Sequence, residues 1–316
     1  MKKISVLVLI AMLLTLILTA CQPQTIIETV EVEVEKIVKE TVVVEKQVER
    51  IVEVTAQPTL PTCTPAVDTP ALLVPGKLVM SINPTIPPVQ YMLQDGTLVG
   101  HSVDVGNEVA RRLCLEPDYV NVQFDAMIPG LHGKRWDVIN TGLFFTEERA
   151  ADMELVPFKL QAMAISAAPG NPLGIKAVED LSGKKVAVEC CGYEETKLRE
   201  LDKTALLDAG LPGMEISTFN TFAEAFLALS SNQVDAVVSG DNTAMFHEEE
   251  EGFEMVFSGL FGRPAALAFE TPELAAAAAK VMQEMYDDGW FKEVDDRYGV
   301  TGIDQWEEWD GTMKVY

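Results

Sequence analysis

The residue best suited to bind a charged group is Arg149, which ends the segment Thr-Glu-Glu-Arg that begins at Thr146. Threonine is a good N-cap, so this segment predicts a helix with Arg149 in its first turn, directly after a strand and a loop. A guanidinium presents a planar pair of donors that matches a carboxylate. Beside Glu147 and Glu148, however, an arginine is more often a solvated surface charge, and the residues alone favour that second interpretation.

The other reactive residue types give little sign of catalysis. The three histidines lie far apart without metal-ligand spacing, and His247 precedes the acidic run 248–251, a pattern typical of a solvated helix end. The chain contains no Gly-x-Ser-x-Gly segment, no phosphate-binding loop and no cysteine cluster. We therefore expect no cofactor and no metal, and ligand binding rather than catalysis, with few general bases near the site.

The N-terminus predicts where the protein is located. Two lysines and a short apolar stretch precede Leu18-Thr19-Ala20-Cys21, the layout of a secretory signal. The apolar stretch is short for a membrane-spanning helix. Small residues before a cysteine resemble the lipobox of bacterial lipoproteins, so we expect a signal peptide over 1–20 and lipidation of Cys21. The rest of the chain would then lie on the extracytoplasmic face of the cell membrane, in the periplasm or at the cell surface.

Two of the remaining cysteines, Cys190 and Cys191, are adjacent, and a bond between them would be a strained vicinal disulfide. We expect two plain thiols there. Over the whole chain, 49 acidic residues against 24 basic ones give a formal net charge of −25. This balance argues against nucleic-acid binding, which depends on basic groups that neutralise phosphate.

Residues 21–56 and 57–76 differ in composition from the rest of the chain. Val, Ile and Thr recur along a coiled-coil-like seam from Val30 to Thr55, with Glu and Lys between them, which predicts a helical stalk that could self-associate. The alternation from Val30 to Glu35 also fits a strand, and a solvated spacer is a third alternative. Residues 57–76 are rich in proline and threonine, which predicts a semi-rigid linker.

The globular part begins near Gly76 and alternates strands with helices, which predicts α/β lobes with mostly parallel sheets. We expect strands at 78–82, 137–139, 185–188 and 234–238. Helices are expected at 103–113 with Ser102 as cap, from Thr146, from about Glu194, after Thr221, and through 272–298.

Several segments in order resemble the periplasmic solute-binding proteins of polar amino-acid ABC importers. These are Ile86-Pro87-Pro88-Val89, Asp95-Gly96-Thr97-Leu98-Val99-Gly100 with Asp104, the block from Phe124 to Leu131, Trp136-Asp137-Val138-Ile139, Thr146–Arg149, Leu181–Val188 and Val234–Val238. The resemblance covers about 77–310. It implies a periplasmic-binding-protein-like fold of two α/β lobes joined by two crossover strands. Lobe one would comprise 77–162 and 264–316, and lobe two 163–263.

The same resemblance implies a function and partners. A small ligand, an amino acid or a similar organic acid, would bind in the cleft between lobes that close around it. A permease and ATPase subunits of an ABC importer would then receive it. A dehydratase-like periplasmic enzyme on the same fold and a ligand-sensing surface lipoprotein remain as alternatives.

Site residues follow from the matching positions. In the resembled family the arginine at Arg149, after the cap Thr146, binds the α-carboxylate of the ligand, and the loop Thr141-Gly142-Leu143-Phe144 contacts the ligand through its backbone. Phe144 stands where the family commonly has serine or threonine, so we expect an apolar wall there. The glycine at position 142 permits close approach.

In lobe two, Gly192 lies in the loop that corresponds to a ligand-binding loop of the resembled family. The backbone N–H groups of that loop, at a helix N-terminus, bind the ligand carboxylate. Tyr193 replaces a small hydroxyl residue and could stack on the ligand. In the resembled family, a carboxylate after the corresponding strand pairs with the ligand ammonium. That position aligns with Gly240 here, so Asp241, one residue later, could take this role only if the loop shifts.

The remaining candidates would form the pocket wall. Ile86 replaces an aromatic residue of the resembled family, Asn83 replaces an acid that some members use for cationic side chains, and Phe124 remains aromatic. We therefore expect a largely apolar pocket that disfavours a strongly cationic ligand.

Overall fold

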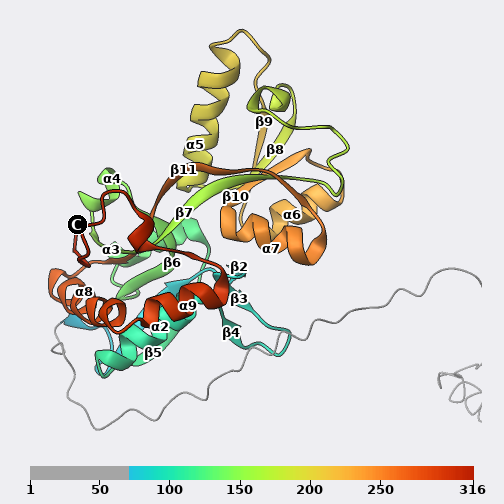
Figure 1. Cartoon of the computed structure of the whole chain (residues 1–316). Coiled ribbons are helices and arrows are strands. Elements are labelled where there is room, and N and C mark those ends of the chain that lie inside the picture. The colour runs from blue at the N-terminus through green and yellow to red at the C-terminus, as the bar shows by residue number, and fades with distance from the viewer. Residues whose placement is uncertain (1–70) are drawn as a thin grey trace, which may run out of the picture. The chain divides into compact units, whose positions relative to one another are not determined.

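The computed structural model describes residues 71–316 (Figure 1). Its main sheet has the strand order β5-β1-β6-β11-β7-β10-β8-β9, and β12 (Thr301–Gly302) pairs with β7 at the side. A small sheet of β2 (Thr85–Ile86), β3 (Gln90–Met92) and β4 (Leu98–Val99) lies apart from it. Within residues 71–316, no helix is both long and apolar enough to cross a membrane.

The first lobe is built on three parallel strands, β1 (Lys77–Ile82), β5 (Glu116–Asn121) and β6 (Val138–Phe144). One apolar core forms where α2 (His101–Arg112), α8 (Pro272–Asp287) and α9 (Trp290–Tyr298) cover the sheet. A second core contains Trp136 and side chains of α3 (Met127–His132).

The second lobe repeats this plan with the parallel strands β8 (Lys185–Glu189), β9 (Glu215–Phe219) and β10 (Ala236–Gly240). Its helices are α5 (Tyr193–Leu201), α6 (Phe222–Ser230) and α7 (Asp241–Glu251). Thr221 caps α6 by accepting a hydrogen bond from the backbone of Glu224, as its sequence predicts.

Two long antiparallel strands, β7 (Glu154–Ala167) and β11 (Glu254–Phe269), join the lobes. They pair along their length, from Glu154 with Phe269 to Ala167 with Glu254, and register shifts interrupt the pairing between Met255 and Arg263. Figure 1 shows them running side by side from one lobe to the other. The predicted fold class is therefore confirmed: two α/β lobes are joined by two crossover strands.

Some predicted boundaries are wrong. Ser102 is not a cap, because α2 begins at His101 and its N-cap is Gly100. The helix expected over 272–298 is two helices, because Gly289 adopts a left-handed conformation with φ 84° between α8 and α9. The packed domain also starts earlier than Gly76: Leu72 lies in a core, and the Leu73 amide donates to Asp137 Oδ1 (2.8 Å).

The predicted signal peptide 1–20, the lipidated Cys21, the stalk 21–56 and most of the linker 57–76 lie outside the described residues. Among the cysteines that are described, Cys190 and Cys191 form a vicinal disulfide, so the expectation of two thiols is wrong. Cys114 is disulfide-bonded as well.

His247 is not solvated as expected. Its side chain is buried, with its ring 3.8 Å from that of Phe226, although the acidic residues after it are largely exposed. His247 therefore belongs to the core of lobe two.

Candidate functional site

The turn after β6 places Arg149 between the lobes. Thr146 Oγ1 accepts a hydrogen bond from the Arg149 amide (3.1 Å) and starts the one-turn helix α4 (Glu147–Ala150), as predicted. The Arg149 Nη1 donates to the carbonyl of Phe144 (2.7 Å), and its guanidinium lies 5.7 Å from the centre of the Phe124 ring. The backbone and one aromatic ring thus orient this guanidinium.

Among the described residues, the charge of Arg149 has no direct partner. Within residues 71–316, no carboxylate lies within ion-pair distance of its guanidinium. Burial lowers the pKa of Arg149, while the more distant charges of Glu194 and Glu148 oppose that shift. A partly buried cation is stabilised by an anionic hydrogen-bond acceptor, so this position favours a ligand with a carboxylate.

Facing Arg149 across the gap is the start of α5. Gly192 is its N-cap, and little space is left for a side chain there, because a Cβ would lie 3.6 Å from the Phe124 ring and 3.0 Å from Glu194 Oε2. Tyr193 follows, and its ring stacks on Phe144 with centroids 4.5 Å apart. The two lobes are therefore in contact through aromatic side chains.

Eight of the eleven predicted site residues line two cavities that share no lining residue. The larger has a volume of about 520 Å³ and is lined by Arg149, Thr146, Gly192 and Tyr193 among others. The smaller, of about 30 Å³, is lined by Ile86, Thr141, Gly142 and Asp241 among others. The structure thus brings these eight residues to the interlobe region but not to one continuous pocket.

Three predicted residues line neither cavity. Phe144 is 3% exposed and packs with the core of lobe two against Tyr193, so it is not an apolar pocket wall in this structure. A side chain without a hydroxyl gains more from this stacking than from facing a small polar cavity. Phe124 lies against Arg149, and Asn83 has a partner in the other lobe.

Side-chain hydrogen bonds hold the loop that lines the small cavity. Gln90 Nε2 donates to both the carbonyl (3.1 Å) and the hydroxyl (2.8 Å) of Thr141, and Gln161 Nε2 donates to the Gly142 carbonyl (2.8 Å). Gly142 has φ 70°, which favours glycine. Sequence reasoning missed both glutamines, because each contacts a loop distant in the chain.

Asp241 lines the small cavity. It is the first residue of α7, and its carboxylate accepts hydrogen bonds from the amides of Asn242 (2.9 Å) and Ala162. Burial raises its pKa, although those hydrogen bonds and Lys159 oppose the shift.

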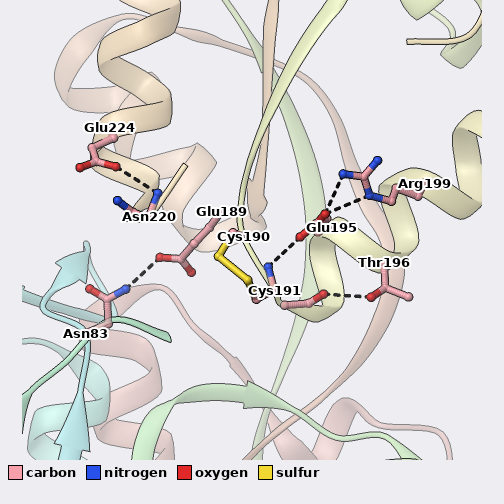
Figure 2. The surroundings of a disulfide bond; sticks show 10 residues. Asn83, Glu189, Cys190, Cys191, Glu195, Thr196, Arg199, Asn220 and Glu224 are labelled. Carbon is pink, nitrogen blue, oxygen red and sulfur yellow. Dashed lines mark hydrogen bonds and ion pairs between the residues drawn. A yellow bond between two sulfur atoms is a disulfide. The ribbon is translucent and has the colours of Figure 1, made fainter. Parts of the chain in front are cut away.

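A buried hydrogen bond crosses between the lobes. Asn83 Nδ2 donates to Glu189 Oε1 (2.8 Å), and both side chains are buried (Figure 2). Burial raises the pKa of Glu189 well above its ordinary value, and the negative charge of Glu194 adds to the shift. Together with Asp241, these carboxylates correct the expectation of few general bases near the cleft, and acidic side chains lie among the apolar residues that were expected there.

Glu189 carried a signal in the sequence. It is the last residue of Lys-Val-Ala-Val-Glu, at the carboxyl end of a parallel strand, where open α/β sheets bind ligands. Its partner, Asn83, lies 106 residues away and could not be inferred from local pattern.

Replacing Glu189 with glutamine should stabilise the protein near neutral pH. A carboxyl group with a raised pKa binds more protons in the folded state than in the unfolded state, so wild-type stability falls as pH rises from the unfolded value of 4.5. The amide of the new side chain would keep an acceptor for Asn83 without the charge. The gain in melting temperature over wild type should be near zero at about pH 4 and clearly positive at about pH 8.

The matched control is Glu179→Gln, which removes an exposed carboxylate from the same lobe. It should show no such pH-dependent gain. Equal behaviour of the two variants would contradict the assignment of Glu189 as a destabilised buried acid.

A buried lysine lies behind the small cavity. Lys159 in β7 is fully buried, and within residues 71–316 its Nζ has no hydrogen-bond partner. A Cβ on Gly142 would lie 3.9 Å from this Nζ. Sequence reasoning missed Lys159, since nothing local distinguishes it from a solvated lysine.

Comparison with known proteins gives a consistent result. The family described as bacterial extracellular solute-binding proteins, family 3, matches residues 78–301. The L-cystine-binding protein TcyJ of Escherichia coli (strain K12) is 24% identical over 228 residues, 71% of this chain and 82% of that protein. The histidine-binding periplasmic protein of the same strain is 25% identical over 236 residues, 71% of this chain and 88% of that protein.

Solved structures agree with the sequence relatives. An ancestral arginine-binding protein bound to arginine superposes with a TM-score of 0.63 at 30% identity, covering 71% of this chain and 98% of that one. The arginine-bound form of truncated ArgBP from T. maritima has a TM-score of 0.60 at 28% identity, covering 66% and 96%. An ancestral amino acid-binding protein, a precursor of cyclohexadienyl dehydratase, has a TM-score of 0.62 at 24% identity, covers 71% and 95%, and shares the fold.

Proposed function

The chain belongs to the bacterial extracellular solute-binding proteins, family 3, and from this premise we propose that it captures an amino acid between its two lobes for an ABC importer. The ligand would bind lobe one first, and the lobes would then close around it by bending at β7 and β11. A permease and ATPase subunits would receive the closed form.

The observation that carries this proposal is the guanidinium of Arg149, which lies opposite Gly192 and pairs with no carboxylate of residues 71–316. Arg149 would bind the ligand carboxylate, and the start of α5 would add backbone N–H groups and the favourable end of a helix dipole. Thr146 orients Arg149 through the cap, and Thr141 and Gly142 would contact the ligand through their backbone.

The positively charged groups of the ligand would meet negative charge. Asp241 lines the small cavity, so an α-ammonium would have a partner there. Glu194 also lines it, and the curated relatives include binding proteins for histidine and L-arginine. We therefore extend the ligand class to polar and cationic amino acids. Phe144 and Tyr193 would have to separate to join the two cavities around a ligand.

The lobes and the N-terminal region complete the proposal. Lobe one would comprise 77–162 with 264–316, and lobe two 163–263. Lipidation at Cys21 would anchor the protein at the extracytoplasmic face of the membrane, and 21–76 would hold the lobes away from that surface. Loss of membrane association in a Cys21→Ala variant would test the anchor.

The test of function is a thermal-shift screen of the purified protein against the common amino acids, cystine, ornithine and small organic acids. A ligand at about a hundred times its Kd stabilises the folded state by about 2.7 kcal/mol, which raises the melting temperature of a domain of this size by roughly 5–10 °C. If no amino acid raises the melting temperature, the proposal is wrong.

A second measurement, on the ligand that the screen identifies, separates binding from catalysis. Glu189, Glu194 and Asp241 could act as general bases, so a dehydratase-like enzyme is the second candidate. Mass spectrometry of the stabilising ligand after incubation should recover it unchanged. A new product would replace the transport proposal with an enzymatic one.

A further inference from the structure

The vicinal disulfide lies in the loop that connects β8 to α5, at the junction of two interlobe contacts. The residue before it, Glu189, accepts the cross-lobe hydrogen bond from Asn83, as Figure 2 shows. The residue after it, Gly192, begins α5 beside Phe124 and lines the cavity of Arg149. The loop therefore adjoins both interlobe contacts of the proposed binding site.

The two cysteines differ in how the fold holds them. The Cys190 amide donates to the carbonyl of Phe219 (2.8 Å), so Cys190 still continues the pairing of β8 with β9. Cys191 has left the sheet and has φ 70°, a left-handed conformation that L-residues rarely adopt. Two constraints hold it there: the disulfide to Cys190 and a hydrogen bond from its amide to Glu195 Oε2 (2.7 Å), both drawn in Figure 2.

Access to the bond is open on one side. Cys191 is exposed and lines the cavity of about 520 Å³ that contains Arg149. Exposed disulfides are the ones that exchange readily with external thiols, whereas buried structural disulfides resist reduction.

We propose that Cys190 and Cys191 form a redox-active pair that exchanges with dithiols, and that the disulfide form is the one with high ligand affinity. A thiolate of the dithiol attacks the sulfur of Cys191, the bond between the cysteines breaks, and Cys190 leaves as a thiolate that takes up a proton. The second thiol of the reagent loses its proton and attacks the mixed disulfide, which releases Cys191. The protein gains two electrons and two protons, and the dithiol becomes a cyclic disulfide.

Reduction removes one of the two constraints on Cys191 and allows the loop to leave the left-handed conformation. Gly192 and the first turn of α5 would then be less well ordered toward Arg149, and the ligand would have to order them on binding. The coupling is reciprocal: if the disulfide raises ligand affinity by some factor, bound ligand opposes reduction by the same factor.

The experiment uses the full chain under native conditions. Dithiothreitol treatment, alkylation and peptide mass spectrometry should show modification of both Cys190 and Cys191. Hydrogen exchange of the amides of 191–196 should accelerate about tenfold on reduction. This part needs no ligand. Absence of alkylation, or unchanged hydrogen exchange after full reduction, overturns the redox proposal.

The affinity part rests on the proposed function and uses the amino acid identified by the thermal-shift screen. Its Kd should rise about tenfold on reduction. The double variant Cys190→Ser/Cys191→Ser should bind like reduced wild type and ignore dithiothreitol, which controls for reduction at Cys114. An unchanged Kd overturns the control of affinity. Failure of any ligand to bind either form contradicts the proposed function, while hydrogen exchange still decides the role of the disulfide.

Discussion

Replacing Arg149 with alanine should raise the Kd for the ligand at least about a hundredfold, which corresponds to about 3 kcal/mol. The guanidinium is already oriented by the Phe144 carbonyl and the Phe124 ring, so the ligand does not bear the cost of ordering it. Because no carboxylate of residues 71–316 pairs with Arg149, a ligand carboxylate would gain a charge-assisted hydrogen bond without displacing an existing ion pair. Isothermal titration calorimetry with the ligand from the screen measures the change.

Two further variants make this result specific. Arg149→Lys keeps the positive charge but loses the planar donor pair, so its affinity should lie between those of wild type and Arg149→Ala. Arg297→Ala removes an exposed arginine of α9 that pairs with Asp104 (3.0 Å), and should leave affinity unchanged. Equal binding by Arg149→Ala and wild type would show that the ligand carboxylate binds elsewhere.

The local features of this site could be predicted because each depends on neighbours in the chain. The hydrogen bond from the Arg149 amide to the Thr146 side chain joins residues only three positions apart. The start of α5 at Gly192 follows from a strand, a glycine and a helical pattern that are consecutive in the sequence. The break between α8 and α9 was also signalled locally by Asp288-Gly289, a turn-forming pair.

The parts that could not be predicted depend on contacts between distant segments. A phenylalanine at 144 predicts burial but not that Tyr193 of the other lobe would cover it. The acidic side chains of the cleft are Glu189, Glu194 and Asp241, which come from two segments of lobe two that meet only when β8 pairs with β10. Composition places 49 acidic residues in the chain but does not indicate which of them become buried.

Lys159 is the strongest case of a residue whose behaviour depends on its distant neighbours. Strand pairing places it between Ala265 of β11 and Gly302 of β12, and its side chain is fully buried. Burial lowers its pKa to about 8, and the attraction of Asp241 and Asp295 only partly opposes that shift. A lysine whose pKa is lowered in the folded state costs stability wherever the unfolded chain is protonated.

Lys159→Met should therefore stabilise the protein by about 3 kcal/mol near pH 7, because methionine fills similar space without an ammonium to desolvate. The folded state loses its proton near pH 8 while the unfolded state keeps it up to 10.5, so wild-type stability rises with pH across that window. The gain from the substitution should then be full below about pH 8 and shrink toward about pH 10. Urea unfolding at about pH 7 and at about pH 10 measures this gain in stability. The control is Lys292→Met, at an exposed lysine of α9 that pairs with Asp296, which should change stability by less than about 0.5 kcal/mol. A Lys159→Met variant that is less stable than wild type at pH 7 would mean that the ammonium is held by the charges of Asp241 and Asp295 more strongly than burial opposes it.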